Sequence, residues 1–289
     1  MKQHFLKTLL TLFIALGGMN AQAQVDLTPV VISTQGTVNT LSPLSQLFKG
    51  KKIGFIGDSI TDPNCYGTEI TKYWQYLQEW LGITPLVQAI SGYEWIHVPM
   101  FADKLYAQAG SDVDAILIFM GTNDFNSGVP IGQWFTESQE QVERAMTGEK
   151  KHWVTRTHRT PVMDDKTVKG RINIALKKLK SLYPDKQVIL MTPLHRALAD
   201  FGDTNYQPDE NYQNECGEYI DAYVQAVKEA GNVWGVPVID LNAVSGLNPM
   251  VPEQLMFFWD ARKDQLHPNS LGHQRMARVI MGHLINFAL

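Results

Sequence analysis

The chain has 289 residues and a formal net charge of −4, with 44% hydrophobic and 19% charged residues. This composition is typical of a globular protein with a sizeable core, and the length suits one domain. No basic block suggests a nucleic acid or an anionic membrane as a partner, so we expect neither.

The N-terminus is predicted to be an export signal that covers residues 1–23. Lys2 and Lys7 give it a positive start, a mostly apolar run follows, and Ala21-Gln22-Ala23 fits the small-residue cleavage rule. The apolar run is too short to span a bilayer comfortably. We therefore expect cleavage near Ala23, export to the periplasm or the extracellular space, and no stable membrane insertion. Removing 23 residues would leave 266 and change the charge to −6, because two lysines and no acidic residue are lost.

Residues 24–48 contain many Thr, Ser, Gln and Pro residues and are predicted to form a linker or N-terminal arm. The domain is expected to span residues 49–289. Within it, apolar runs typical of strands alternate with helical patterns. The expected strands are 53–56, 86–90, 115–120, 188–192 and 236–241. The expected helices are 70–81, 96–109, 171–182, 212–227 and a last one around 276–283, with Asn269-Ser270 as its cap.

Alternating strands and helices favour parallel strands joined by right-handed crossovers. The apolar runs are nearly continuous, which is typical of strands that are buried on both faces. The predicted fold is therefore an α/β protein, a three-layer α/β/α sandwich around a five-stranded, mainly parallel, flavodoxin-like sheet.

One connection is longer than a crossover needs. Residues 125–166 form an insertion at the carboxyl edge of the third strand, where long insertions often cover a site. The insertion contains Trp134, Phe135 and Trp153 and no long apolar lid helix.

Four short blocks follow strands or precede the last helix. Gly57-Asp58-Ser59 ends the first strand, Ser91-Gly92 follows the second, and Gly121-Thr122-Asn123-Asp124 follows the third. The fourth block, Asp264-Gln265-Leu266-His267, comes just before the last helix. Any one block is common in turns. Parallel strands, however, bring all their carboxyl ends to one sheet edge, where ligands bind in open α/β sheets.

In block order and spacing the chain resembles the SGNH hydrolases, also called the GDSL esterase/lipase family. The resemblance spans nearly the whole chain after the export signal, and Ile60 is a conservative departure from the leucine of the family name. It implies the SGNH hydrolase fold and a serine hydrolase that acts on carboxylic esters through an acyl-enzyme.

Chemistry supports the same assignment of the predicted site residues. A serine hydroxyl needs an adjacent base, which predicts Ser59 as nucleophile and His267 as base. Asp264 is expected to hold the imidazole in one tautomer. The Ser59 and Gly92 backbone N–H groups and the Asn123 amide are the expected oxyanion-hole donors.

Other site classes fit poorly. The sequence has no Gly-x-Ser-x-Gly, Ser-x-x-Lys or Gly-x-Gly-x-x-Gly block, and nothing has the spacing of a zinc site, so we expect no cofactor and no metal. Cys65 and Cys216 permit either one disulfide or two buried thiols. Asp58 is expected to brace the turn, and His195 is expected on an exposed loop or at the pocket.

The expected substrate is a small-molecule or glycan ester, with an acetylated carbohydrate favoured because the aromatic residues of the insertion suit stacking on sugar rings. Two alternatives stay open. One is a lipase, lysophospholipase or thioesterase with the same triad. The other is a non-catalytic glycan-binding protein that keeps the fold. The sequence does not predict the oligomeric state.

Overall fold

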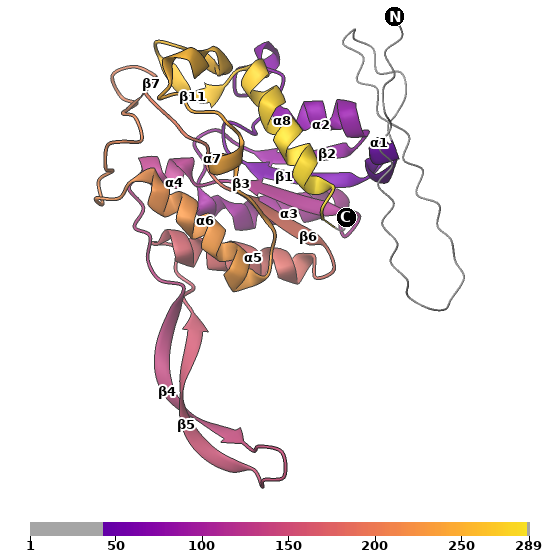
Figure 1. Cartoon of the computed structure of the whole chain (residues 1–289), viewed down its shortest axis with the longest axis vertical. Coiled ribbons are helices and arrows are strands. Elements are labelled where there is room, and N and C mark those ends of the chain that lie inside the picture. The colour runs from indigo at the N-terminus through magenta and orange to yellow at the C-terminus, as the bar shows by residue number, and fades with distance from the viewer. Residues whose placement is uncertain (1–42, 288–289) are drawn as a thin grey trace, which may run out of the picture. The chain divides into compact units, whose positions relative to one another are not determined.

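A computed structural model describes residues 43–287. The expected export signal and most of the expected linker lie outside these residues. The centre of the domain is a five-stranded sheet in the order β2-β1-β3-β6-β9, with every neighbouring pair parallel (Figure 1). The strands are β1 (Lys52–Gly57), β2 (Thr84–Ala89), β3 (Ala115–Phe119), β6 (Gln187–Met191) and β9 (Val238–Ile239). The predicted flavodoxin-like sheet is confirmed.

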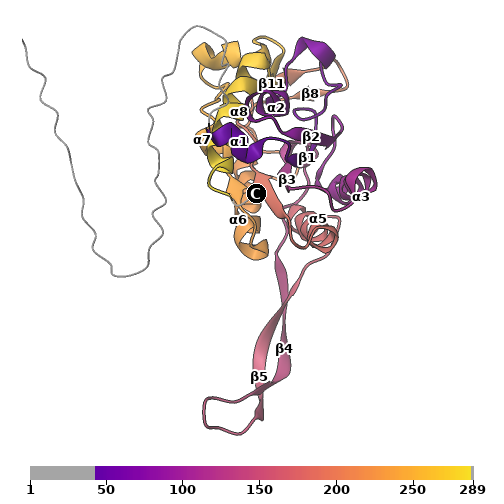
Figure 2. The same ribbon diagram turned by 90° about the vertical axis from the view of Figure 1, so that its right-hand side faces the viewer.

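Two helical layers cover the sheet (Figure 2). Alternate residues of the strands pack with each layer. Ile116 and Ile118 of β3 pack with one layer, whereas Leu117 and Phe119 pack with the other. The first layer consists of α3 (Val98–Ala109), α5 (Val168–Leu182) and α6 (Ile220–Trp234). The second consists of α1 (Pro43–Phe48), α2 (Tyr73–Leu81), α7 (Leu241–Val244) and α8 (Ser270–Leu284). The three-layer sandwich is thus formed by two apolar cores, one on each face.

Several element boundaries differ from the prediction for local reasons. Helix α6 begins at Ile220 rather than near residue 212, because residues 211–219 form turns in which Asn214 Oδ1 accepts from Cys216 N and Glu218 N. Helix α1 lies within the expected linker, and its buried Phe48 joins the core, so the folded domain begins before residue 49. The predicted cap of α8 is present: Asn269 Oδ1 accepts from Leu271 N and Gly272 N.

The insertion forms a long hairpin that was not predicted. Strands β4 (Phe135–Arg144) and β5 (His152–Pro161) pair over ten residues each. Figures 1 and 2 both show this hairpin projecting from the body of the domain. Almost every side chain of the hairpin is exposed, so its sequence lacks the alternation of apolar and polar residues that predicts a strand.

A second, small antiparallel sheet adds to the domain in the order β10-β11-β7-β8. Its strands are β7 (Ala199–Asp200), β8 (Tyr206–Gln207), β10 (Phe258–Asp260) and β11 (Asp264–Pro268). The predicted Asp-x-x-His loop is therefore strand β11, held by β10 on one side and β7 on the other. Among the helices of residues 43–287, none combines the length and apolarity that a bilayer crossing needs.

Candidate active site

The sheet register brings the first three sequence blocks to one edge. Gly57, the last residue of β1, pairs with Ala89 at the end of β2 and with Phe119 at the end of β3. The chain leaves all three strands on the same side, so the residues that follow are neighbours. Short helix α4 (Thr122–Asn126) begins directly after β3 and carries Asn123.

Ser59, His267 and Asp264 form one hydrogen-bonded chain. The Ser59 Oγ lies 2.9 Å from the Nε2 of His267. The Nδ1 of the same ring lies 2.8 Å from Asp264 Oδ2 and 3.1 Å from Oδ1. All three residues are buried. This is the geometry in which an imidazole can take the proton of a serine hydroxyl while a carboxylate holds the ring.

Asp264 is anchored by more than the imidazole. Its Oδ1 accepts from the backbone N–H groups of Leu266 and His267 at 3.2 and 3.0 Å. Its Oδ2 also accepts from the Tyr66 hydroxyl. Burial alone would raise the pKa of Asp264, but the hydrogen bonds from His267 and Tyr66 lower it below its usual value. Asp264 therefore stays ionised at neutral pH, as a partner for an imidazolium must.

Tyr66 belongs to the candidate site and was not expected from the sequence. It is the one non-glycine residue within 43–287 that has a positive φ, 60°, and strain of this kind gathers at functional sites. Its ring stacks on Trp259 with centroids 4.4 Å apart and meets the His267 ring edge-on at 5.4 Å. No sequence signal marks a left-handed tyrosine, because the constraint comes from these distant partners.

The turn after β1 is tight because Thr61 folds back over Gly57. A Cβ on Gly57 would collide with the Thr61 side chain, so glycine is needed here for close approach. Asp58 braces this turn as expected, with Oδ1 accepting from Ile60 N at 3.1 Å. Lys72, also buried, donates from Nζ to the Ser59 carbonyl at 3.3 Å. Burial lowers the pKa of Lys72.

Asp58 is expected to make stability fall as pH rises from about 4 to about 7. Burial raises the pKa of Asp58 to about 7 from an ordinary 3.8, so in this window the folded state holds a proton that the unfolded state has lost. The stabilisation is fully present below about pH 4 and disappears above about pH 7. Three pKa units correspond to at most about 4 kcal/mol.

Asp58→Asn tests this expectation, because asparagine keeps an acceptor for Ile60 N and cannot titrate. The free energy of unfolding is measured in urea at pH 4.5 and at pH 7.5. The difference between the variant and the wild type should shift in favour of the variant by roughly 2–4 kcal/mol from the lower pH to the higher. Any cost of the new amide is the same at both pH values, so the slope is the readout. Parallel pH curves for the two proteins would contradict the assignment.

The expected oxyanion donors converge beside Ser59. Neither the Ser59 nor the Gly92 backbone N–H donates to another group within residues 43–287. Asn123 Nδ2 donates to the Tyr93 carbonyl at 3.0 Å, which fixes the amide and leaves its second N–H available. Asp62 fixes Ser91, the residue before Gly92, because its Oδ2 accepts from both the backbone N–H and the hydroxyl of Ser91.

A cavity of about 320 Å³ opens over these groups. Four of the five predicted site residues line it: Ser59, Gly92, Asn123 and His267. The fifth, Asp264, lies behind His267. The lining also includes side chains that the sequence did not single out: Tyr66, Phe201, Asn205, Gln207 and Leu266. Phe201, Asn205 and Gln207 lie on or between β7 and β8, two-residue strands that carry no detectable sequence period.

The aromatic residues of the insertion lie away from this cavity. None of Trp134, Phe135 and Trp153 lines the cavity over Ser59. Trp134 is buried and donates from Nε1 to Glu229 of α6 at 2.7 Å, so it anchors the hairpin base. Trp153 is 66% exposed on the projecting hairpin.

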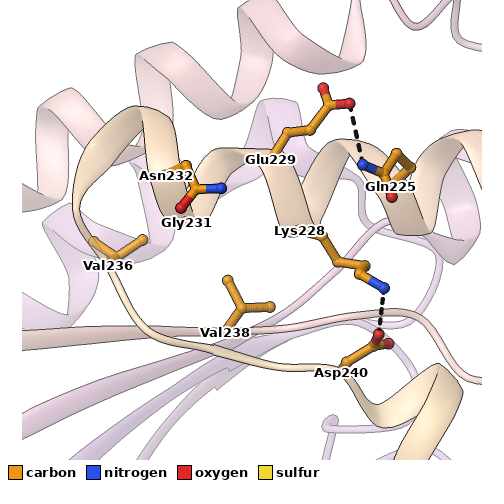
Figure 3. Close-up of a pocket in the computed structure, with 8 residues that line it drawn as sticks. All are labelled: Gln225, Lys228, Glu229, Gly231, Asn232, Val236, Val238 and Asp240. Atoms are coloured by element: carbon orange, nitrogen blue, oxygen red, sulfur yellow. Dashed lines mark hydrogen bonds and ion pairs between the residues drawn. The ribbon is translucent and has the colours of Figure 1, made fainter.

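A larger cavity, of about 480 Å³, lies between α6 and β9 (Figure 3). In Figure 3, Lys228 points to Asp240, and the two form an ion pair of 2.7 Å. The lining of this larger cavity holds no serine, cysteine or histidine, so the cavity lacks a nucleophile and an imidazole base. The cavity over Ser59 is therefore the candidate active site.

The remaining candidates occupy structural positions. Cys65 and Cys216 are both free thiols, with Cys65 at the cavity over Ser59 and Cys216 exposed in the turns before α6, so neither the disulfide nor two buried thiols is seen.

His195 Nδ1 lies 2.6 Å from Glu210 Oε1, and this contact raises the pKa of His195 despite its partial burial. His195 does not line the cavity. Residues 43–287 contain no cluster of His, Cys, Asp and Glu suited to a metal ion.

Comparison with solved structures finds relatives of the fold. A crystal structure of a protein from Lactobacillus plantarum is 23% identical, covers 83% of this chain and 99% of its own, and has a TM-score of 0.62. A possible lipase from Chitinophaga pinensis is 19% identical, covers 81% of this chain and 98% of its own, and has a TM-score of 0.58. At these identities the likeness concerns the fold. No curated protein matches the sequence significantly.

The sequence profile of the GDSL-like Lipase/Acylhydrolase family matches residues 55–275, from β1 into α8. The match covers about three quarters of the chain and includes all four blocks. The expected resemblance to SGNH hydrolases is confirmed. The chain belongs to the GDSL-like Lipase/Acylhydrolase family and is a carboxylic ester hydrolase.

Proposed function

We propose that this protein is a serine esterase that uses Ser59, His267 and Asp264 through an acyl-enzyme, and that its substrates are acetylated carbohydrates. The observation that carries the mechanism is the unbroken hydrogen-bonded chain from Ser59 Oγ through the His267 ring to Asp264. It opens into a cavity large enough for an ester, and the unpaired backbone N–H groups lie beside it.

In the first step, Ser59 Oγ attacks the ester carbonyl carbon while His267 Nε2 takes the hydroxyl proton. The carbonyl oxygen becomes an oxyanion that the Ser59 and Gly92 N–H groups and the Asn123 amide stabilise. The tetrahedral intermediate collapses, the alcohol leaves with the proton from His267, and an acetyl group stays on Ser59. Water then repeats the sequence with the same base, which releases acetate and restores the serine.

The choice of substrate rests on the side chains around the cavity. Tyr66 and Phe201 are aromatic, and Trp259 stacks behind Tyr66. Asn205 and Gln207 add amide groups to the same lining. Aromatic faces combined with amide donors and acceptors suit a sugar ring, which presents C–H faces and hydroxyl groups. These residues, rather than the aromatic residues of the insertion, lie where a sugar ring would bind.

Acyl-chain length tests this choice against a lipase-type reading. Activity on p-nitrophenyl acetate should exceed activity on p-nitrophenyl octanoate by about ten-fold or more in kcat/KM, because about 320 Å³ must hold both the acyl group and the leaving alcohol. Steady-state kinetics on the ester series gives the ratio. A preference for chains of eight carbons or longer would support the lipase reading instead. Glycan binding with no ester turnover would support a binding protein.

A further inference from the structure

A second, smaller cavity lies next to the catalytic one. Its volume is about 220 Å³, whereas a single water needs only about 10–15 Å³, so it has room for a ring-sized ligand. It shares two lining residues, Asn205 and Gln207, with the catalytic cavity. A ligand whose ester lies at Ser59 would therefore reach the second cavity by passing these two amides.

Helix α4 connects the two cavities on the other side. Asn123 lines the catalytic cavity, and Asn126, three residues later on α4, lines the second one. Residues three apart on a helix are neighbours on its surface. The side chain of Asn126 is half-buried, and it makes no hydrogen bond within the described part of the chain. Its amide is thus held at a cavity wall with both donor and acceptor free.

The wall between the cavities is rigid because a buried arginine holds it. Arg196 is only 1% exposed, and its Nη2 donates to Gln207 Oε1. Its Nη1 reaches the Thr122 carbonyl at 3.4 Å and the Thr122 hydroxyl at 3.3 Å. Gln207 Nε2 in turn donates to Asn205 Oδ1 at 2.8 Å, so the amide nitrogen of Asn205 remains free for a ligand. Such pre-ordering reduces the entropy lost when a ligand binds.

Two exposed tyrosines stand at the second cavity. Tyr206 of β8 is 62% exposed and Tyr212 is 61% exposed, and both line it. Neither hydroxyl makes a hydrogen bond to the described residues. Large aromatic rings left this open beside a polar cavity offer flat apolar faces with a polar tip, the combination that stacks on a sugar.

We propose that this second cavity is a carbohydrate subsite. In our assignment, Asn126, Tyr206, Tyr212 and the amide of Asn205 bind a sugar unit of the alcohol part of the substrate, next to the unit whose acetyl group is at Ser59. The inference rests on the proposed function and adds to it: the substrate is an acetylated oligosaccharide rather than an acetylated monosaccharide.

The test compares chain length and variants on the full protein. Acetylated xylose and mannose are compared with acetylated xylotriose and mannotriose, with p-nitrophenyl acetate as an ester that has no sugar. The wild type should show at least a roughly ten-fold higher kcat/KM on one of the trisaccharide acetates than on the matching monosaccharide. Tyr212→Ala and Asn126→Ala should raise KM for that trisaccharide by roughly five- to ten-fold relative to any change on p-nitrophenyl acetate. Tyr219→Ala is the matched control, since Tyr219 is exposed nearby and lines neither cavity.

The outcomes separate the two proposals. Absence of turnover on every acetyl ester, including p-nitrophenyl acetate, would overturn the proposed function. Turnover without a gain from the longer sugar, or variants that change all substrates equally, would overturn the subsite and leave the esterase standing. Thermal melting of each variant confirms that it is folded, and Tyr206→Phe, which keeps the ring, should retain the trisaccharide preference that Tyr206→Ala loses.

Discussion

Replacing Ser59 with alanine is expected to lower kcat/KM on p-nitrophenyl acetate by at least about 10⁴-fold, to the level of background hydrolysis. The substitution removes the nucleophilic oxygen that is hydrogen-bonded to His267 Nε2, so no acyl-enzyme can form. Remaining catalysis would come from the oxyanion donors and from binding alone. A fluorophosphonate reagent should label the wild type at Ser59, and mass spectrometry should find no label at this site in the variant.

The fold should tolerate this change. Within the described part of the chain the Ser59 hydroxyl makes one hydrogen bond, to His267, and the turn is held by Asp58 and Lys72 through other atoms. The melting temperature should therefore move by no more than a few degrees. Ser127→Ala is the matched control: the Ser127 side chain is exposed and its hydroxyl donates to Glu94 rather than to a residue of the triad, so this variant should keep its activity. Turnover by Ser59→Ala within ten-fold of the wild type would remove Ser59 from the mechanism.

Asp264→Asn is expected to cost about 10³- to 10⁴-fold in kcat, by analogy with serine proteases. The reason lies in the backbone of β11. Because Oδ1 accepts from two N–H groups, an asparagine would place its carbonyl oxygen there and turn its NH₂ group toward His267 Nδ1. The ring would then carry its proton on Nε2. An Nε2–H group facing Ser59 Oγ cannot accept the serine proton, although shape and hydrogen-bond count hardly change.

The control for this variant is Asp260→Asn on the neighbouring strand β10. Asp260 Oδ1 caps a turn by accepting from Arg262 N, and the residue does not line the catalytic cavity. Activity should persist in this control and fall in Asp264→Asn, while circular dichroism and melting stay close to the wild type for both. If Asp264→Asn kept more than about a tenth of the wild-type kcat, the carboxylate would not control the tautomer of His267.

The central sheet and the positions of four blocks were predictable from the chain alone. Continuous apolar runs such as the one ending at Gly57 can be buried only as central strands, and the helical patterns between them enforce parallel order. Polar residues placed after β1, β2 and β3 must then meet at one edge. The Asp-x-x-His spacing likewise predicted that Asp264 would reach His267, because both lie on one short segment.

The hairpin and the second sheet were not predictable, because no local hydrophobic pattern in the sequence marks their strands. Strands β4 and β5 expose both faces and show no hydrophobic period. Strands β7 and β8 are two residues long, and β7 is held by pairing with β8 on one side and with the distant β11 on the other. The sequence therefore does not indicate that Tyr66 and Phe201, rather than the aromatic residues of the insertion, line the cavity.

The sequence by itself determined the layers of the domain, the nucleophile turn and the identity of the groups that can carry an ester reaction, since each depends on residues near in the chain or on strand order. Tertiary structure alone decided which side chains surround those groups. The contact from Tyr66 to Asp264 spans 198 residues, and the Arg196 contact that fixes Gln207 joins a buried charge in the segment between β6 and β7 to an amide on β8. Such contacts form only after the sheet is assembled, because burial and hydrogen bonding are properties of the packed chain rather than of any segment within it.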